Sequence, residues 1–267
     1  MKHHFELNEL RRCSDVEYNN ALEDVRYQIG DKNSLMYWNK KSVCDEDYNK
    51  LIDDDTVTVL AYKNATVQKA NTVALQRRKV KIIVCHAEHN KAIGDSVLDD
   101  GKSKVKRTLA VGKGARVSLT HNLDTKHGLF NGAAGTIEHV LFENEEAFDN
   151  RTPYMALVKI KSYDELNGID AAYFDHPGFG EKLIPISWIY DSFSVNGTSI
   201  RRKGLPLTLN YAMTIHKAQG RSLDKVVVIT DGLETAKEAH TLFYVAITRA
   251  KKALQMFFKG DVFPKVL

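Results

Sequence analysis

Short apolar segments rich in β-branched residues alternate with helical segments near both ends of this sequence, and this alternation limits the possible folds more than any other feature. A strand is predicted over residues 56–62, a helix from Asn64 or Thr66 onward, and a second strand over residues 81–86. A strand, a helix and a strand in that order are typical of an α/β domain with a mostly parallel sheet. The sequence therefore predicts an α/β fold.

The same alternation returns after residue 204. The predicted elements there are a strand over 207–213, a short helix over 214–219, a strand over 225–229, a helix through Leu242, Val245 and Ala246, and a strand near 254–258. Between the two α/β segments, residues 115–203 are rich in short strands separated by turns that contain glycine or asparagine, which suits a small barrel. These strands are predicted over 116–120, 135–140, 155–160 and 184–189.

Residues 1–55 form a predicted helical lead-in. Ser14 and Glu17 have the spacing of a capping box, in which the side chain of each residue accepts a hydrogen bond from the backbone N–H of the other. Apolar residues then recur at helical spacing as far as Ile29, and Gly30 is a predicted stop. A shorter helix is predicted over 45–52.

The composition is that of an ordinary globular protein, with 267 residues, 43% hydrophobic and 27% charged, and a formal net charge of +4. This mildly basic balance permits a nucleic-acid partner without requiring one. Cys13, Cys44 and Cys85 lie far apart, so neither a zinc site nor a disulfide framework is predicted. The N-terminus has no signal-peptide core, and no window reaches the roughly 18 apolar residues of a membrane span. We therefore expect a soluble intracellular protein without a membrane partner or a metal site.

Residues 211–228 carry the first group of candidate functional residues. A strand there ends in a short helix that begins at Thr214, presents His216 and Lys217, and stops at Gly220. A hydroxyl and free N–H groups at the start of a helix suit an anion such as a backbone phosphate. Gly220 permits a sharp turn or the close approach of a ligand.

Residues 242–254 carry the second group, because an apolar helix face there ends at Thr248 and Arg249. An arginine in this place projects from a rigid element, and its planar, permanently charged fork matches phosphate oxygens. A plainer interpretation also stays open. Arg249 can be a cation near a helix C-terminus, where the helix dipole favours positive charge.

The two segments together resemble motifs V and VI of superfamily 1 helicases. Thr-Ile-His-Lys-Ala-Gln-Gly over 214–220 and Tyr-Val-Ala-Ile-Thr-Arg-Ala over 244–250 resemble the 1B branch, which includes RecD and the PIF (petite integration frequency) helicases. Residues 114–124, which end in Asn-Leu-Asp, and residues 128–135, which contain Asn-Gly, resemble the PIF branch specifically.

The resemblance implies a RecA-like motor domain, which is a P-loop NTPase fold, as the second such domain of a helicase. A small SH3-like β-barrel insert would interrupt it. The implied bounds are 1–55 for the lead-in, 56–114 together with 204–267 for the motor domain, and 115–203 for the insert. Such helicases use ATP and Mg²⁺, move along single-stranded DNA in the 5′ to 3′ direction, and unwind duplex DNA.

The roles of individual residues are implied by the same resemblance. Arg249 matches the arginine finger, which would stabilise charge on the transferring γ-phosphoryl group. The implied cofactor-binding residues are Gln219, Gly220, Arg221 and Ser222. The implied DNA-binding residues are Thr214, His216, Lys217, Asn64, Asn122 and Asn131. Residues 59–65, with Asn71 downstream, resemble motif IV more weakly, and Lys63 stands there where relatives often carry an arginine.

The sequence lacks the motif that grips nucleotide phosphates, Gly-x-x-x-x-Gly-Lys-Ser/Thr. The nearest string, residues 101–103, has Ser96 where a glycine is required, and no strand leads into it. Residues 53–55 follow too short an apolar run to form a Walker B strand. Both motifs lie on the first motor domain in this family. We therefore expect a missing N-terminal RecA-like domain to bind ATP and Mg²⁺, and this chain alone to be inactive.

Alternatives stay open at several positions. An enzymatically inactive single-stranded-DNA-binding fragment or decoy would have the same fold, and an unrelated α/β protein could mimic the motifs. Structural explanations exist for a histidine at 216, a core tryptophan at 188, a hairpin turn at 131–132, and a solvated basic loop at Lys102, Lys104, Lys106 and Arg107. A nuclear or mitochondrial location is favoured. DNA repair, recombination and telomere maintenance are possibilities that belong to the family.

Overall fold

The computed structural model describes residues 15–90, 103–160, 183–252 and 255–261. The chain divides into two compact units. Unit 1 comprises Met1–Ala74 and Tyr211–Leu267, and unit 2 comprises Leu75–Asn210. Cys13, Ser14 and Lys102, which the sequence analysis considered, lie outside the described residues.

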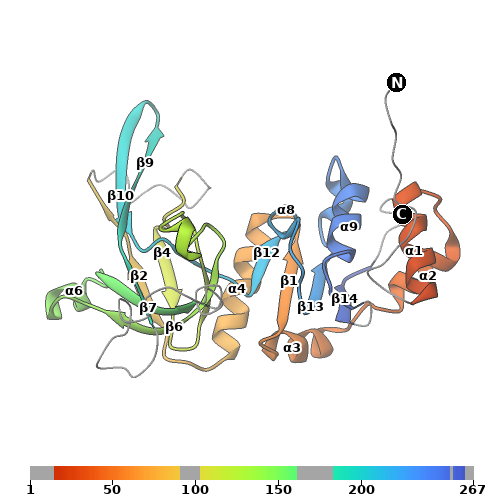
Figure 1. Cartoon of the computed structure of the whole chain (residues 1–267), viewed down its shortest axis with the longest axis horizontal. Coiled ribbons are helices and arrows are strands. Elements are labelled where there is room, and N and C mark those ends of the chain that lie inside the picture. The colour runs from red at the N-terminus through yellow and green to blue at the C-terminus, as the bar shows by residue number, and fades with distance from the viewer. Residues whose placement is uncertain (1–14, 91–102, 161–182, 253–254, 262–267) are drawn as a thin grey trace. The chain divides into compact units, whose positions relative to one another are not determined.

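Unit 1 is built on a four-stranded parallel sheet in the order β12-β1-β13-β14. The strands, side by side in Figure 1, are β1 (Val57–Ala61), β12 (Ala212–Thr214), β13 (Lys225–Ile229) and β14 (Met256–Lys259). All of β1 and the middle of β13 are buried. Strands that are covered on both faces need continuous β-branched or apolar runs, and both strands have them. The predicted α/β fold with a parallel sheet is confirmed.

Helices cover both faces of this sheet. They are α1 (Val16–Tyr27), α2 (Lys32–Asn39), α3 (Asp45–Asp53), α4 (Asn64–Arg77), α8 (Ile215–Ala218) and α9 (Ala239–Ile247), with a short 3-10 helix η3 (Leu233–Thr235). Val59 of β1 packs with residues of α3 and α4, whereas the next residue, Leu60, packs with residues of α8 and α9. Successive side chains of a strand point to opposite faces, so each face has its own apolar core.

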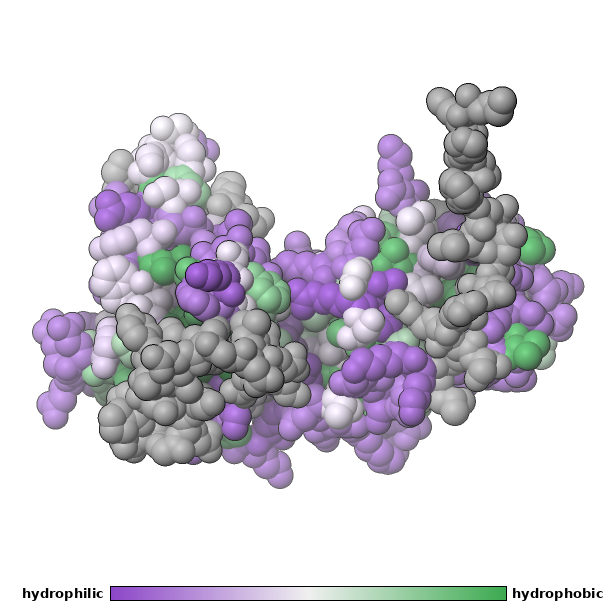
Figure 2. Space-filling model, in the orientation of Figure 1, coloured by the Kyte–Doolittle hydropathy of each residue, from purple (hydrophilic) through white to green (hydrophobic). Residues whose placement is uncertain are grey.

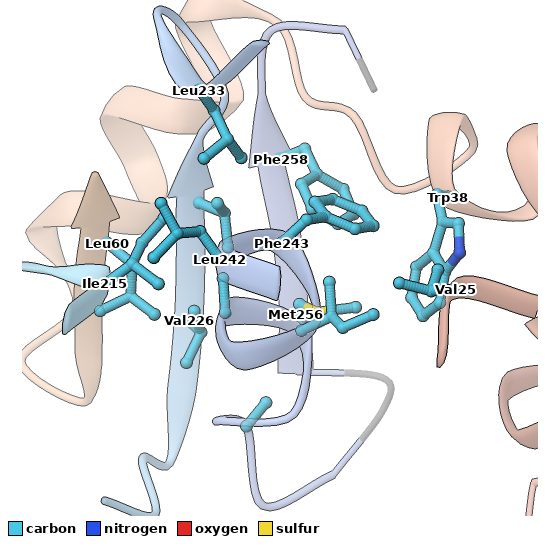
Figure 3. Close-up of a cluster of buried hydrophobic side chains, with 14 of the residues drawn as sticks. Val25, Trp38, Leu60, Ile215, Val226, Leu233, Leu242, Phe243, Met256 and Phe258 are labelled. Atoms are coloured by element: carbon cyan, nitrogen blue, oxygen red, sulfur yellow. The ribbon is translucent and has the colours of Figure 1, made fainter. Parts of the chain in front are cut away.

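Trp38 attaches the N-terminal helices α1 and α2 to the core of unit 1. Its side chain is fully buried, and its ring makes edge contacts with Tyr18, Phe243 and Phe258 at centroid distances of 5.8, 6.0 and 6.3 Å. Figure 3 shows Trp38 beside Val25 and facing the stacked pair of Phe243 and Phe258. Such aromatic pairs add to the stabilisation from buried area.

The ends of α1 differ from the prediction. The carboxylate of Asp15 accepts a hydrogen bond from the Tyr18 N–H at 3.0 Å, so Asp15 caps the helix in place of the predicted Ser14. The helix ends at Tyr27 because Gln28 adopts a left-handed conformation with φ of 56°. Ile29, which was predicted to belong to the apolar face, is therefore outside the helix and 67% exposed.

Unit 2 is made mainly of antiparallel strands. Its five-stranded sheet has the order β11-β5-β6-β7-β8, with β5 (Arg116–Leu119), β6 (Ala134–Leu141), β7 (Met155–Ile160), β8 (Ile184–Ser187) and β11 (Leu207–Leu209). A three-stranded sheet has the order β3-β10-β9, with β3 (Glu88–His89), β9 (Ile189–Val195) and β10 (Thr198–Gly204). A 3-10 helix η1 (Thr125–His127) and a helix α6 (Glu145–Asp149) complete the unit. The strands predicted over 116–120, 135–140 and 155–160 are confirmed, whereas the one predicted over 184–189 ends at Ser187, and Ile189 begins β9 of the other sheet.

The predicted strand over residues 81–86 does not join the parallel sheet. It forms β2 (Ile83–His86), which pairs in antiparallel fashion with β4 (Thr108–Val111) in unit 2. Only Cys85 of β2 is buried, whereas a central parallel strand is buried on both faces. The interpretation of 56–86 as a strand, helix and strand of one parallel sheet was wrong. The contacts group residues 75–114 with unit 2, although the sequence analysis assigned them to the motor domain.

The predicted strand over residues 207–213 is two strands that belong to different sheets. β11 pairs with β5 in unit 2, and β12 pairs with β1 in unit 1. The break is held by the buried side chain of Asn71 on α4. Its Oδ1 accepts hydrogen bonds from the N–H groups of Tyr211 and Ala212 at 2.9 Å each, and its Nδ2 donates to the Ala212 carbonyl at 3.0 Å.

No helix within the described ranges is both long and apolar enough to cross a membrane.

Replacement of Asn71 by leucine should lower the stability of unit 1 by about 2–4 kcal/mol, because two N–H groups and a carbonyl would be buried without partners. Urea unfolding of the whole chain measures this loss. Thr72→Ala, on the exposed side of the same helix, is the control and should change stability by less than about 0.5 kcal/mol. Equal stability of the two variants would show that the clamp at Asn71 is dispensable.

Asp54 should contribute stability that is lost in acid. Hydrogen bonds from Lys225 Nζ at 2.8 Å and from the N–H and Oγ1 of Thr56 lower the pKa of its carboxyl to about 2. The pKa is lower in the folded chain than in the unfolded chain, so the stabilisation is present above about pH 4 and disappears as the pH falls toward 2. The side chain is 36% exposed, so the effect should stay below about 1 kcal/mol.

The measurement for Asp54 is urea unfolding between pH 2 and pH 6. Asp54→Asn should flatten the pH dependence of the free energy of unfolding in this range, whereas Asp261→Asn, at an exposed position, should leave it unchanged. Parallel curves for the original chain and Asp54→Asn would contradict the assignment.

Candidate functional site

The short helix that follows β12 begins at Thr214, as predicted. Thr214 is the N-cap of α8, and its Oγ1 accepts a hydrogen bond from the Lys217 N–H at 3.3 Å. The hydroxyl therefore already has a structural partner. The helix has four residues, so its start alone does not make an anion site. Thr214 chiefly fixes the direction in which the next residues leave the sheet.

His216 and Lys217 are both exposed on α8. The imidazole of His216 lies 6.3 Å from the ring of Tyr62, measured between centroids, with the two planes tilted by 40°. The exposure of the ring argues against a buried structural histidine. The helix thus presents a cation and an imidazole to solvent, together with the neighbouring aromatic ring, which are groups that suit contact with a nucleic-acid backbone.

A tight turn over Gln219–Ser222 joins α8 to β13. The Arg221 N–H donates to the Ala218 carbonyl at 3.0 Å, and Gly220 has φ of 79°. No heavy atom lies within 4 Å of the position that a Cβ on Gly220 would take. Glycine is required here for the left-handed backbone, and the turn leaves open space above it. Gln219, Gly220 and Ser222 are exposed, whereas Arg221 is half-buried.

The guanidinium of Arg249 is docked on this turn. Its Nη1 donates to the carbonyl of Arg221 at 3.2 Å, its Nη2 bonds Thr248 Oγ1 at 2.8 Å, and its Nε donates to the Val245 carbonyl at 2.9 Å. Thr248 is the C-cap of α9. The structure thus supports the plainer role of Arg249 at the end of α9. It also brings the predicted arginine finger against the predicted cofactor-binding turn.

A short backbone bridge holds the two segments together. The Leu223 N–H donates to the Arg249 carbonyl at 2.9 Å, and the Lys251 N–H donates to the Leu223 carbonyl at 2.8 Å. A parallel bridge pairs Leu223 with Ala250, and Lys251 Nζ bonds Asp224 Oδ1 at 2.6 Å. The two motifs recognised separately in the sequence are therefore one structural element.

Asn64 lies at the first residue of α4 and is exposed. The side chain of the preceding residue, Lys63, lies against Gly232, where a Cβ would come within 2.7 Å of Lys63 Nζ. The motif IV residue Asn71 has a structural role instead, because it clamps the start of β12.

Asn122 and Asn131 belong to unit 2, in the loop that joins β5 to β6. Both are exposed, and Asn122 Oδ1 accepts a hydrogen bond from the Asn131 N–H at 2.8 Å. Gly132, with φ of 94°, donates its N–H to the Leu119 carbonyl at 2.8 Å, which is consistent with a simple turn. The loop is thus closed by its own asparagines, and Phe130 on it is 44% exposed.

Trp188 is not a core residue, so that interpretation of the sequence was wrong. It is half-buried between β8 and β9, and the Nζ of Lys203 lies 4.2 Å from its ring centroid. Tyr190, Arg201 and Lys203 beside it were not recognised as candidates. The alternation of polar and apolar residues over 189–195 and 198–204, joined by Asn196-Gly197, is the signal that could have found this hairpin.

The described residues contain no group of three or more His, Cys, Asp or Glu that could hold a metal ion. Two features of this chain could contact a nucleotide. They are the guanidinium of Arg249 and the turn at Gly220, which has open space beside it. These groups fit one side of a phosphate, and a second set of donors would have to complete its binding site.

Comparisons with known proteins agree with the motifs. Residues 209–256 match the family described as the UvrD-like helicase C-terminal domain. The ATP-dependent DNA helicase Pif1 of Campylobacter jejuni is 27% identical over 251 residues, which cover 91% of this chain and 51% of that protein. The ATP-dependent DNA helicase PIF1 of Xenopus laevis is 31% identical over 163 residues, which cover 61% of this chain and 21% of that protein. The chain thus spans at most about half the length of these relatives.

Solved structures share the fold. The crystal structure of Bacteroides Pif1 bound to ssDNA has a TM-score of 0.68 at 17% identity. The match covers 97% of this chain and 52% of the Bacteroides chain. The crystal structure of Pif1 helicase from Candida albicans has a TM-score of 0.64 at 18% identity, with 97% of this chain and 57% of that chain covered. The α/β fold of this chain is therefore the RecA-like fold of helicases.

The fold, the joined motifs and the relatives make this chain similar to a C-terminal segment of ATP-dependent DNA helicases. Along most of its length the chain is similar to Pif1 helicases in sequence and in fold.

Arg249→Ala should speed amide hydrogen exchange at Leu223 and Lys251, because the Arg221 carbonyl would lose the guanidinium that holds the turn. We expect stability to fall by only about 1 kcal/mol. Exchange measured by mass spectrometry tests this, with Lys252→Ala as a control at an exposed cation nearby. Unchanged exchange in Arg249→Ala would mean that the backbone bridge holds the turn without the guanidinium.

Proposed function

We propose that this chain is the C-terminal portion of an ATP-dependent DNA helicase that moves 5′ to 3′ on single-stranded DNA and unwinds duplex. The observation that carries the proposal is the docking of Arg249 on the turn at Arg221, within a RecA-like fold. Such an arrangement couples a phosphate-binding arginine to a segment whose other end presents His216 and Lys217 to solvent.

The proposed roles follow this arrangement. Arg249 acts as the arginine finger, and the turn of Gln219, Gly220, Arg221 and Ser222 lies against the nucleotide. ATP and Mg²⁺ supply the transferring phosphoryl group and its neutralising charge, and they are held mainly by another RecA-like domain. This chain contributes the guanidinium that balances charge on the γ-phosphate side. Its own sequence has no P-loop to wrap the phosphates.

The proposed partner is single-stranded DNA. Thr214, His216 and Lys217 in unit 1, with Asn64 at the start of α4, would contact its backbone. Asn122 and Asn131 on the β5–β6 loop of unit 2 would make further contacts. The relatives are named ATP-dependent DNA helicases, and one solved relative is bound to ssDNA, which supports this partner.

We further propose that the β-rich segment predicted over 115–203 is an SH3-like insert in a motor domain made of 56–114 and 204–267. The antiparallel order β11-β5-β6-β7-β8 supports a small β-fold for the insert. Residues 75–114 cluster with it, so the insert in this chain would begin earlier than the motif pattern indicated. Repair, recombination and telomere maintenance, in the nucleus or the mitochondrion, are the settings in which we propose that such a helicase acts.

The first test measures single-stranded-DNA binding and ATP hydrolysis by the whole chain. We expect binding at low salt and no hydrolysis with or without DNA. Lys217→Ala should reduce the slope of log K against log salt by about 0.7 if the lysine contacts one phosphate. Arg249→Ala should leave DNA affinity unchanged, because the guanidinium faces the nucleotide side. DNA-stimulated hydrolysis that disappears in Arg249→Ala would contradict the proposal of an incomplete motor.

A second candidate function is an inactive single-stranded-DNA-binding fragment or decoy, which the missing P-loop favours. A mixture of this chain with the other half of the Campylobacter jejuni relative separates the two. Hydrolysis that appears in the mixture and is lost with Arg249→Lys supports a motor portion, because lysine keeps the charge without the planar fork. DNA binding without hydrolysis in any mixture supports the decoy.

A further inference from the structure

The β9–β10 hairpin has one buried and one exposed face. Phe193, Ile200 and Arg202 are buried, whereas the residues that alternate with them are largely exposed. The side chains of the outer face are Tyr190, Ser192, Ser194, Ser199, Arg201 and Lys203. The turn at Asn196-Gly197 has φ of 48° and 77°, which suits a tight hairpin with the natural strand twist. Figure 2 shows a largely pale surface over the hairpin, between the hydrophilic and hydrophobic extremes.

Aromatic rings and cations alternate on this outer face. Arg201 Cζ lies 4.0 Å from the ring centroid of Tyr190, and Lys203 Nζ lies 4.2 Å from that of Trp188. The two rings are neighbours, with centroids 5.2 Å apart and an interplanar angle of 74°. We call Trp188, Tyr190, Arg201 and Lys203 the hairpin face.

The hairpin face is more open than a structural aromatic pair requires. Tyr190 is 50% exposed, although a buried tyrosine would stabilise the fold far more. A cation–π contact at an exposed site contributes only about 0.5–1 kcal/mol. The small contribution of these contacts to the stability of the fold therefore does not explain why the rings of Tyr190 and Trp188 remain accessible to solvent.

The charge balance of the hairpin face favours an anionic ligand. Lys203 forms an ion pair with Glu88 at 3.0 Å, whereas the outer face of β9 and β10 places no carboxylate beside Arg201. Lys106 adds a second positive charge, because it lines a shallow pocket together with Trp188, Lys203 and Glu88. The hairpin carboxylate Asp191 is on the opposite face, where Ser103 Oγ and the Lys104 N–H donate to it at 2.7 Å each.

The sheet below the hairpin face is rigidly held. Arg202 is 1% exposed, donates from Nη1 to the Val105 carbonyl at 3.0 Å, and bonds His89 Nε2 at 2.8 Å. Asn90 makes two hydrogen bonds to the backbone of Arg201. Its Oδ1 accepts one from the Arg201 N–H at 2.8 Å, and its own N–H donates one to the Arg201 carbonyl. Rings on a fixed sheet lose little entropy when a ligand stacks on them.

We propose that the hairpin face is a binding site for single-stranded DNA, in which bases stack on Tyr190 and Trp188 while Arg201 and Lys203 contact the adjacent phosphates. The proposal rests on the proposed function and adds a site to it that the helicase motifs do not include. Every base offers a π-face, so binding through stacking tolerates any sequence. A duplex hides those faces, so the hairpin face should select single strands.

Tryptophan fluorescence of the whole chain reports this contact directly. The sequence has two tryptophans, and Trp38 is fully buried, so a quench on addition of an oligothymidylate must come from Trp188. Trp188→Phe should abolish the quench while fluorescence anisotropy of a labelled oligonucleotide still shows binding. A duplex of the same length should quench much less.

Affinity tests the second ring. Tyr190→Ala should weaken binding by about 5- to 150-fold, the range for loss of one stacked base, and Tyr190→Phe should retain most of the affinity. Tyr27→Ala, which removes a 59% exposed tyrosine beside Arg26 in unit 1, is the matched control and should bind normally. Arg201→Gln should reduce the salt slope by about 0.7. Circular dichroism and thermal unfolding identify any variant that does not fold, and the fluorescence quench of Trp188 in the original chain then carries the test.

The outcomes separate this site from the proposed function. Binding that persists in Tyr190→Ala, with no quench of Trp188 in the original chain, would overturn the hairpin face and leave the motif-based DNA contacts intact. Equal affinity for duplex and single strand would also overturn it. Failure of the whole chain to bind any single strand at low salt would instead overturn the proposed function, and the hairpin face with it.

Discussion

The carboxamide of Asn71 makes it possible for one continuous segment to serve two sheets. Between β11 and β12 the chain leaves an antiparallel ladder and enters a parallel one, and at that point three of its backbone groups bond the side chain of Asn71. A buried amide supplies an acceptor and a donor at the correct spacing, so the N–H groups of Tyr211 and Ala212 and the Ala212 carbonyl stay satisfied. The position of Thr214, and of every residue of the motif after it, depends on this junction.

A series of local contacts after that junction fixes the position of Arg249. Thr214 caps α8, Gly220 reverses the chain, and Leu223 pairs with Ala250 beside the end of α9. The same few residues therefore fix both the turn and the guanidinium that rests on it. The hairpin face has a comparable foundation in unit 2, where the buried Arg202 replaces the apolar residue that a sheet core would normally contain. Both surfaces are built from polar side chains that are satisfied mostly by backbone carbonyls.

Most strands and the main helices could be predicted from local periodicity, because burial on one or two faces leaves a pattern in the sequence. Which sheet a strand joins could not. β2 resembles a strand of the parallel sheet in composition, yet it pairs with β4, and the break at 210–211 is set by Asn71, which is 140 residues away along the chain. The motif residues were found because their types and spacing are unusual. Trp188 was misplaced because a tryptophan in a β-rich segment gives no sign of which face it occupies.

The bond between Arg249 and the carbonyl of Arg221 has a thermodynamic consequence. The Nη1 hydrogen that points at this carbonyl can have one good acceptor at a time, so a phosphate oxygen that took it, in the proposed role of Arg249, would displace the Arg221 carbonyl and loosen the turn. By linkage, anything that loosens the turn favours phosphate capture by the same free energy with which phosphate capture loosens the turn. If Arg249 binds phosphate as proposed, a pull on the backbone between α8 and β13 would therefore alter its affinity for phosphate.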